Sequence, residues 1–136
     1  MSSTSSTASP SIPYAPGTLQ RAQRAICCSP FQLKLLTTMR YERVELGAIA
    51  HPSGVHQGYT RLPLSELAAE NGLIWLIQVG VLRREVDGQG ITDSFRLTPL
   101  GRQLVDQWVA QGQELTAPTW RDRLLNLLAR RIRLPF

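Results

Sequence analysis

The stretch VLRREVDGQGITDSFRLTPLGRQLVDQW, residues 81–108, decides the fold. Residues 81–86 are typical of a strand, residues 87–90 of a glycine-containing turn, and residues 94–97 of an alternating return strand, so we expect a hairpin. Thr98 then caps a helix that has Pro99 in its first turn. The apolar face of this helix consists of Leu100, Leu104, Val105, Trp108 and Val109.

Two more helices are expected upstream of the hairpin. Residues 18–28 place small and aliphatic side chains at helical spacing. Ser29, Pro30 and Gln32 then form a cap, a first-turn proline and a capping-box partner, which predicts a helix over residues 30–40. Its buried stripe is Phe31, Leu35, Leu36 and Met39.

The segments GVLRR (80–84) and FRLTPLG (95–101) on either side of the hairpin resemble the wing and following helix of winged helix-turn-helix proteins of the bacterial regulator type. The resemblance covers about residues 30–110. It implies an α+β, mainly helical fold with a two-stranded wing, a recognition helix in the DNA major groove and a wing on the backbone or minor groove. The whole chain also resembles a small protein family from cyanobacteria, and this resemblance implies no activity.

Two positions remain open for the helix-turn-helix. In the first, residues 46–50 begin it, Gly54 and Val55 form the turn, and recognition begins at His56. The candidate base readers are then Gln57, Tyr59, Thr60 and Arg61.

In the second position, residues 64–70 form the scaffold helix, Asn71-Gly72 forms the turn, and residues 73–79 form a recognition helix that runs into the wing. The outward side chains are then Ile74, Trp75, Ile77 and Gln78, of which only Gln78 is a usual base reader. Three readings stay open for this apolar face: the first helix, the arm or the tail covers it, it binds a protein or a second copy, or it reads bases.

The net charge of +5 is concentrated at the C-terminus. Residues 118–136 carry five arginines and one aspartate, a balance of +4, whereas the remainder carries ten basic and nine acidic residues, a balance of +1. A body this close to neutral makes a weak electrostatic case for binding phosphates. In the wing, Arg83, Arg84 and Arg96 are candidates for phosphate contacts, although acidic residues accompany them.

The C-terminal segment predicts a basic amphipathic helix that Thr119 and Asp122 open. Trp120, Leu124, Leu127 and Leu128 form its apolar face. Such a helix packs on its own domain or on a second copy, or binds an anionic membrane surface, an acidic partner or nucleic acid. The candidate contacts are Arg121, Arg123, Arg130, Arg131 and Arg133.

The sequence contains no recognised motif for catalysis or for cofactor binding. A metal site is not expected either, because Cys27 and Cys28 are adjacent and the two histidines lack further ligands. We divide the chain into a Ser/Thr/Pro-rich disordered arm (1–17), a winged-helix domain (18–112), and a linker with a basic helix (113–136). The function we favour is a cytoplasmic, non-catalytic adaptor or regulatory module that binds a protein partner through the apolar recognition face. The alternatives are a DNA-binding transcriptional regulator and a peripheral membrane protein attached through residues 118–136.

Overall fold

The computed structural model describes residues 13–86, 93–112 and 120–132, without the side chains of residues 120–122, 129, 131 and 132. The fold is α+β and mainly helical, as expected. Its elements are α1 (Pro16–Cys28), α2 (Leu33–Tyr41), β1 (Val44–Glu45), α3 (Leu46–Ile49), α4 (His51–Gln57), α5 (Glu66–Gln78), β2 (Leu82–Val86), β3 (Asp93–Leu97), α6 (Pro99–Ala110) and α7 (Trp120–Ile132).

The sheet has three antiparallel strands in the order β1-β3-β2. The hairpin expected from the sequence is confirmed, since Leu82 pairs with Leu97 and Arg84 with Phe95. Its predicted turn, residues 87–90, lies outside the described residues. The short strand β1 joins the other side of β3 through the pair Val44 and Phe95, so β3 is central and β2 lies at an edge.

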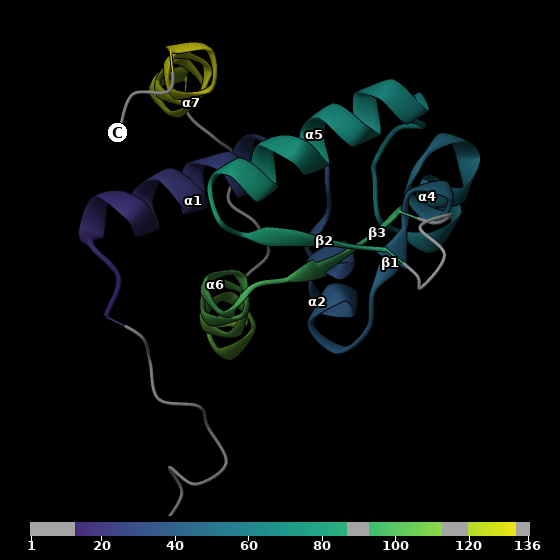
Figure 1. Cartoon of the computed structure of the whole chain (residues 1–136), viewed down its shortest axis with the longest axis horizontal. Helices are drawn as coiled ribbons and strands as arrows, with labels where there is room; N and C mark the ends of the chain where they lie inside the picture. The colour runs from purple at the N-terminus through teal and green to yellow at the C-terminus, as the bar shows by residue number, and fades with distance from the viewer. Residues whose placement is uncertain (1–12, 87–92, 113–119, 133–136) are drawn as a thin grey trace, which may run out of the picture.

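Helices cover both faces of the sheet. Figure 1 shows α5 above the sheet with α1 beside it and α7 on α1, while α2 and α6 lie below. The side chain of Phe95 is fully buried at the centre, together with Leu35 of α2 and Leu76 of α5. Burying such large apolar side chains supplies most of the free energy that stabilises a domain of this size.

The cap of the helix after the wing forms as expected. The Thr98 hydroxyl accepts a hydrogen bond from the Gly101 N–H at 3.1 Å and lies within bonding distance of the Gly80 and Val81 carbonyl oxygens. Thr98 therefore ties the start of α6 to the start of the β2-β3 hairpin. Leu100, Leu104 and Val105 are buried and Trp108 is half-buried, but Val109 is 55% exposed, so its assignment to the apolar face is wrong.

Two helix starts differ from the expectation. α1 begins at Pro16 rather than at residue 18, and Tyr14 packs against the core, so these residues of the predicted arm belong to the folded part of the chain. α2 begins at Leu33, because Ser29 closes α1 by donating to the Ile26 carbonyl at 2.7 Å. The expected capping box at Ser29 is therefore wrong, although Phe31, Leu35, Leu36 and Met39 are all buried as expected.

Neither predicted turn of the helix-turn-helix forms at its expected place. Gly54 lies inside α4, which ends at Gly58 with a φ of 77°. Asn71 and Gly72 lie inside α5, which Ser65 caps and which continues unbroken to Gln78. A Cβ at Gly72 would lie 3.0 Å from the Phe31 ring, so this glycine permits a close approach between two segments rather than a turn.

Candidate protein-binding surface and its covering helix

The outward face of α5 is the centre of the candidate site. Its side chains differ in exposure: Trp75 is 6% exposed, Ile74 and Ile77 are half-buried, and Gln78 is exposed. Trp75 is therefore covered, whereas Gln78 faces solvent. Of the three readings of this face, cover from within the same chain describes the structure.

Helix α7 supplies the cover through contacts with Trp75. The indole Nε1–H of Trp75 donates a hydrogen bond to Asn126 Oδ1 at 2.9 Å. The Arg130 guanidinium carbon lies 6.0 Å from the centroid of the same ring, at the outer limit of a cation–π contact. Arg130 also donates to the Asn71 carbonyl at 3.1 Å, so α7 is tied to α5 at two neighbouring turns.

Asn126 is a site residue that the sequence reasoning missed. It interrupts the run LLNLL of residues 124–128, where an apolar helix face would otherwise be continuous. A polar side chain within such a run needs a partner when it is covered, because an unpaired buried polar group is costly. This interruption was the signal that could have marked Asn126 as a specific contact.

The leucines of the apolar face expected for α7 are only partly covered. Leu125, Asn126 and Leu128 are half-buried, and α7 packs mainly against α1, which it crosses in Figure 1. Leu124 and Leu127 are 45% and 47% exposed, so they do not share the packed side of α7 with Leu128. Arg123 and Arg130 are exposed beside them. The cap at Thr119 and the side chains of Trp120, Arg121, Asp122, Arg131 and Arg133 lie outside the described residues.

The four candidate base-reading residues at and after the end of α4 differ in their exposure to solvent. Gln57 and Arg61 are exposed, whereas Tyr59 is 8% and Thr60 3% exposed. The backbone there has a structural role: the Tyr59 carbonyl accepts from the Gln32 N–H at 2.8 Å, and Phe31 and Thr60 form an isolated bridge. The expectation that Tyr59 and Thr60 offer their side chains to bases is therefore wrong.

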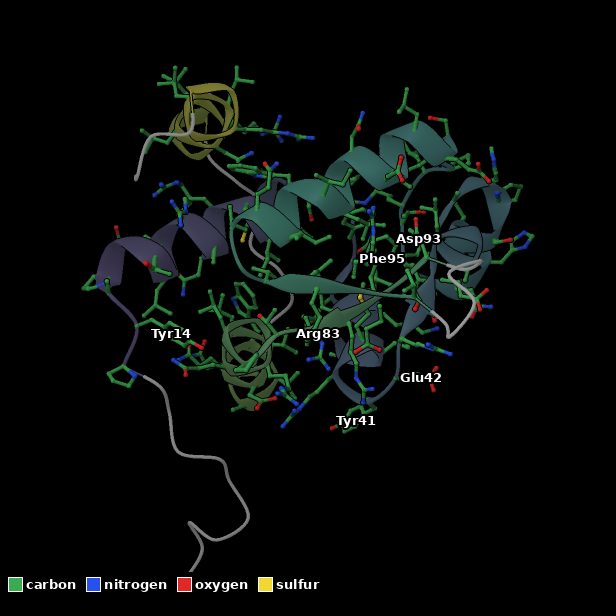
Figure 2. The ribbon with its side chains drawn as sticks, viewed as in Figure 1. Tyr14, Tyr41, Glu42, Arg83, Asp93 and Phe95 are labelled. Atoms are coloured by element: carbon green, nitrogen blue, oxygen red, sulfur yellow. The ribbon has the colours of Figure 1, made fainter. Side chains whose placement is uncertain are left out.

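Each arginine of the wing already has a partner in the protein. Arg83 lies 2.9 Å from Glu85, and Arg84 lies 3.7 Å from Glu70 and 3.9 Å from Asp93. Arg96 donates to the Tyr41 carbonyl at 3.1 Å. Figure 2 shows Asp93 and Phe95 on the α5 side of the sheet and Arg83 and Tyr41 on the side of α2 and α6. The β2-β3 hairpin therefore presents paired charges on both faces.

In the described part of the chain, no group of three or more His, Cys, Asp or Glu side chains is placed to hold a metal ion. Cys27 and Cys28 are present as thiols at the end of α1. Over the same residues, no helix is both long enough and apolar enough to cross a bilayer.

A family model described as Npun_F0494-like matches residues 12–130 of the chain. No curated protein and no solved structure matches it. The matched range includes both α5 and the contacting residues of α7, so the candidate surface and its cover lie within one family region.

Proposed function

The chain belongs to the Npun_F0494-like family, and we propose that it is a non-catalytic winged-helix module that binds a helix of a protein partner on the Trp75 face of α5. The observation that carries this proposal is that the face already holds a helix. α7 reaches Trp75 through the Asn126 hydrogen bond and the Arg130 contact. A surface that accepts one amphipathic helix has the geometry to accept another of the same chemistry.

The contacts of α7 with α5 are weak enough for the helix of a partner to displace α7. Among the side chains of α7 that the structure describes, Asn126 and Arg130 bond directly to α5, and Arg130 is exposed to water. Such contacts contribute little net free energy each. Leu124 and Leu127 remain about half exposed, so α7 does not bury its full apolar surface here. A partner helix with a hydrogen-bond acceptor and a cation four residues apart would reproduce the contacts of Asn126 and Arg130.

The order of the elements supports the winged-helix part of the proposal. α2, β1, α3 with α4, α5 and the β2-β3 hairpin follow one another along the chain, and β1 pairs with β3 beside the hairpin. In a winged helix-turn-helix of this order, α5 is the helix in the recognition position and the hairpin is the wing. This makes a DNA-binding regulator the second candidate.

The charges on α5 count against DNA. Glu66 is exposed and Glu70 is partly exposed on this helix, where phosphates would approach. Arg83, Arg84 and Arg96 would have to leave their present partners to reach a duplex. A protein partner does not require phosphates to approach these acidic side chains, and it does not require the arginines to leave their partners, so we rank it first.

The experiment tests whether the Trp75 face accepts a helix supplied in trans. A fluorescently labelled peptide of residues 118–136 is titrated into the full chain carrying Asn126→Ala and Arg130→Ala, and its anisotropy is followed. We expect it to bind more tightly than to the unsubstituted chain, whose own α7 competes, and to lose binding when Trp75→Ala is added.

Two controls make the result specific. Leu67→Ala changes an exposed leucine elsewhere on α5 and should leave binding unchanged. A scrambled peptide of the same composition measures attraction by charge alone. Equal binding of the peptide to the chains with and without Trp75 would reject the proposal, and tight, salt-sensitive binding of a DNA duplex by the unsubstituted chain would favour the second candidate.

A further inference from the structure

Helices α1 and α7 pack against each other and together carry the whole net charge of the chain. α1 contains Arg21 and Arg24 and no acidic residue, a balance of +2. α7 contains four arginines and one aspartate, a balance of +3. The rest of the chain carries nine basic and nine acidic residues and is neutral, so the +5 of the chain is concentrated in this pair of helices.

This pair of helices lies at one end of the molecule. Figure 1 shows α7 on α1 at the top left, with the sheet, α2 and α6 below them, and no described element lies beyond α7 in this view. A molecule with a basic end and a neutral body is oriented by a negatively charged surface, toward which the basic end turns. The outer side of α7 is then the part of the protein that meets this surface.

The outer side of α7 combines leucines with arginines. Leu124 and Leu127 are three residues apart, hence on one face of the helix, and are 45% and 47% exposed. Arg123 and Arg130 are exposed beside them, and neither forms an ion pair with a described acidic side chain. An apolar contact surface with unpaired cations next to it is typical of helices that lie on anionic membranes.

We propose that this end of the molecule binds the surface of a membrane that contains anionic lipids, with Leu124 and Leu127 inserted at the level of the lipid headgroups. The arginines of α1 and α7 attract the anionic headgroups. The two leucines leave water at the boundary between headgroups and acyl chains, and the strength of binding rises with the apolar area that is buried there. Because two leucines bury little area, the attachment is reversible.

The chemistry of this face favours a membrane over other partners. In a complex with nucleic acid, Leu124 and Leu127 would lie against phosphates, whose charge they cannot pair. The helix of an acidic partner would need a groove, whereas Figure 1 shows the outer side of one helix at the edge of the molecule. A second copy would bring two basic helices together, and like charges repel. A bilayer requires only leucines and arginines that are exposed side by side.

Membrane binding leaves α7 in its place on α5. Asn126, which accepts the hydrogen bond from the Trp75 indole at 2.9 Å, is one residue from Leu127 and two residues from Leu124. Side chains at these spacings do not share a face of a helix. The membrane and Trp75 therefore contact different sides of α7, and this inference does not rest on the proposed binding of a partner helix.

The test is cosedimentation of the full chain with phosphatidylcholine vesicles, with and without phosphatidylglycerol. We expect binding to the anionic vesicles that weakens as the salt concentration rises, and little binding to the neutral ones. Leu124→Gln with Leu127→Gln keeps the net charge and should weaken binding by about tenfold, because the inserted apolar surface is lost. The matched control is Val86→Gln with Val109→Gln, which changes two exposed apolar residues on β2 and α6 and should leave binding unchanged.

Heparin affinity separates the attraction of charges from insertion. The leucine variant should bind heparin as the unsubstituted chain does, whereas Arg123→Glu should bind both heparin and anionic vesicles less tightly. Thermal unfolding verifies that each variant keeps its fold. The proposal is overturned if the full chain does not bind anionic vesicles at low salt, which would leave this face to an acidic protein partner. It is also overturned if the leucine variant binds the vesicles as well as the unsubstituted chain does.

None of these variants changes Trp75, Asn126 or Arg130. The peptide titration that tests the proposed function can therefore fail while vesicle binding is observed, and the reverse result is equally distinguishable.

Discussion

The indole N–H of Trp75 and the amide oxygen of Asn126 form a 2.9 Å hydrogen bond between side chains 51 positions apart. Trp75 lies on α5, the helix that leads into the β2-β3 hairpin, and Asn126 lies within the leucine-rich run of α7. The bond therefore connects the surface that could meet a partner with the segment that now covers it.

We expect Asn126→Ala to lower the free energy of unfolding by about 1–2 kcal/mol, because it leaves the Trp75 N–H without its partner in a covered position. Chemical denaturation measures the change. Trp75→Phe removes the same bond from the other side, so the two losses should add to more than the loss in the double variant. Strict additivity would show that the bond makes no contribution to the attachment of α7.

Gly72→Ala should destabilise the protein by about 1–3 kcal/mol. The new Cβ would lie 3.0 Å from two atoms of the Phe31 ring, closer than packed carbon atoms tolerate, and Phe31 is buried. Gly17→Ala is the matched control, because Gly17 is also helical and has no atom within 4 Å of the added Cβ. That control should be neutral or stabilising. Equal melting temperatures for the two variants would contradict the close contact of α5 with Phe31.

Phe95→Ala should cost about 3–5 kcal/mol, since Phe95 is fully buried in the central strand and its loss opens a cavity. Arg96→Ala, at the next position, removes only an exposed hydrogen bond to the Tyr41 carbonyl and should cost far less. Urea denaturation of the two variants gives the comparison. Small and equal losses would show that the side chains of β3 do not alternate as the register requires.

The hairpin and the helix that follows it could be predicted from the sequence because their signals are local. Alternation in the return strand and the Thr98-Pro99 pair lie within a few residues of the structures that they determine. Gly72 could not be interpreted in the same way. It resembles a turn signal beside Asn71, and only the position of Phe31, far earlier in the chain, shows that the glycine serves close packing.

The sequence indicated Trp75 as the central side chain of the candidate site, but it did not indicate which segment covers Trp75. The helical spacing selected Trp75 as a prominent side chain before the hairpin, although the two helices expected over residues 64–70 and 73–79 form one helix, α5. Its cover depends on where α7 lies after residues 113–119, and amphipathicity alone does not indicate which face of a helix turns inward. The expected apolar face included Leu124 and Leu127, which the packing of α7 against α1 leaves about half exposed.

Truncation after residue 117 removes both the basic residues of the C-terminal segment and the helix α7 that contacts Trp75. It removes +4 of the +5 net charge, since residues 118–136 carry five arginines and one aspartate. The remaining body of +1 should lose most of its nonspecific attraction to heparin, DNA and anionic vesicles. The sheet core of Phe95, Leu35 and Leu76 lies upstream, so a cooperative thermal transition should persist at a lower temperature.

The same truncation uncovers Trp75, and this gives a second readout. Loss of Asn126 and Arg130 exposes the indole to water, so the protein should bind an apolar dye and self-associate more than the full chain does. A full-length variant with Arg121, Arg123, Arg131 and Arg133 changed to Gln is the control, because it lowers the charge while keeping Asn126 and Arg130. It should lose heparin binding without gaining dye binding. If the truncated chain instead binds a DNA duplex with unchanged affinity and salt dependence, the tail is not the electrostatic contact, and recognition through α5 and the wing becomes the better account.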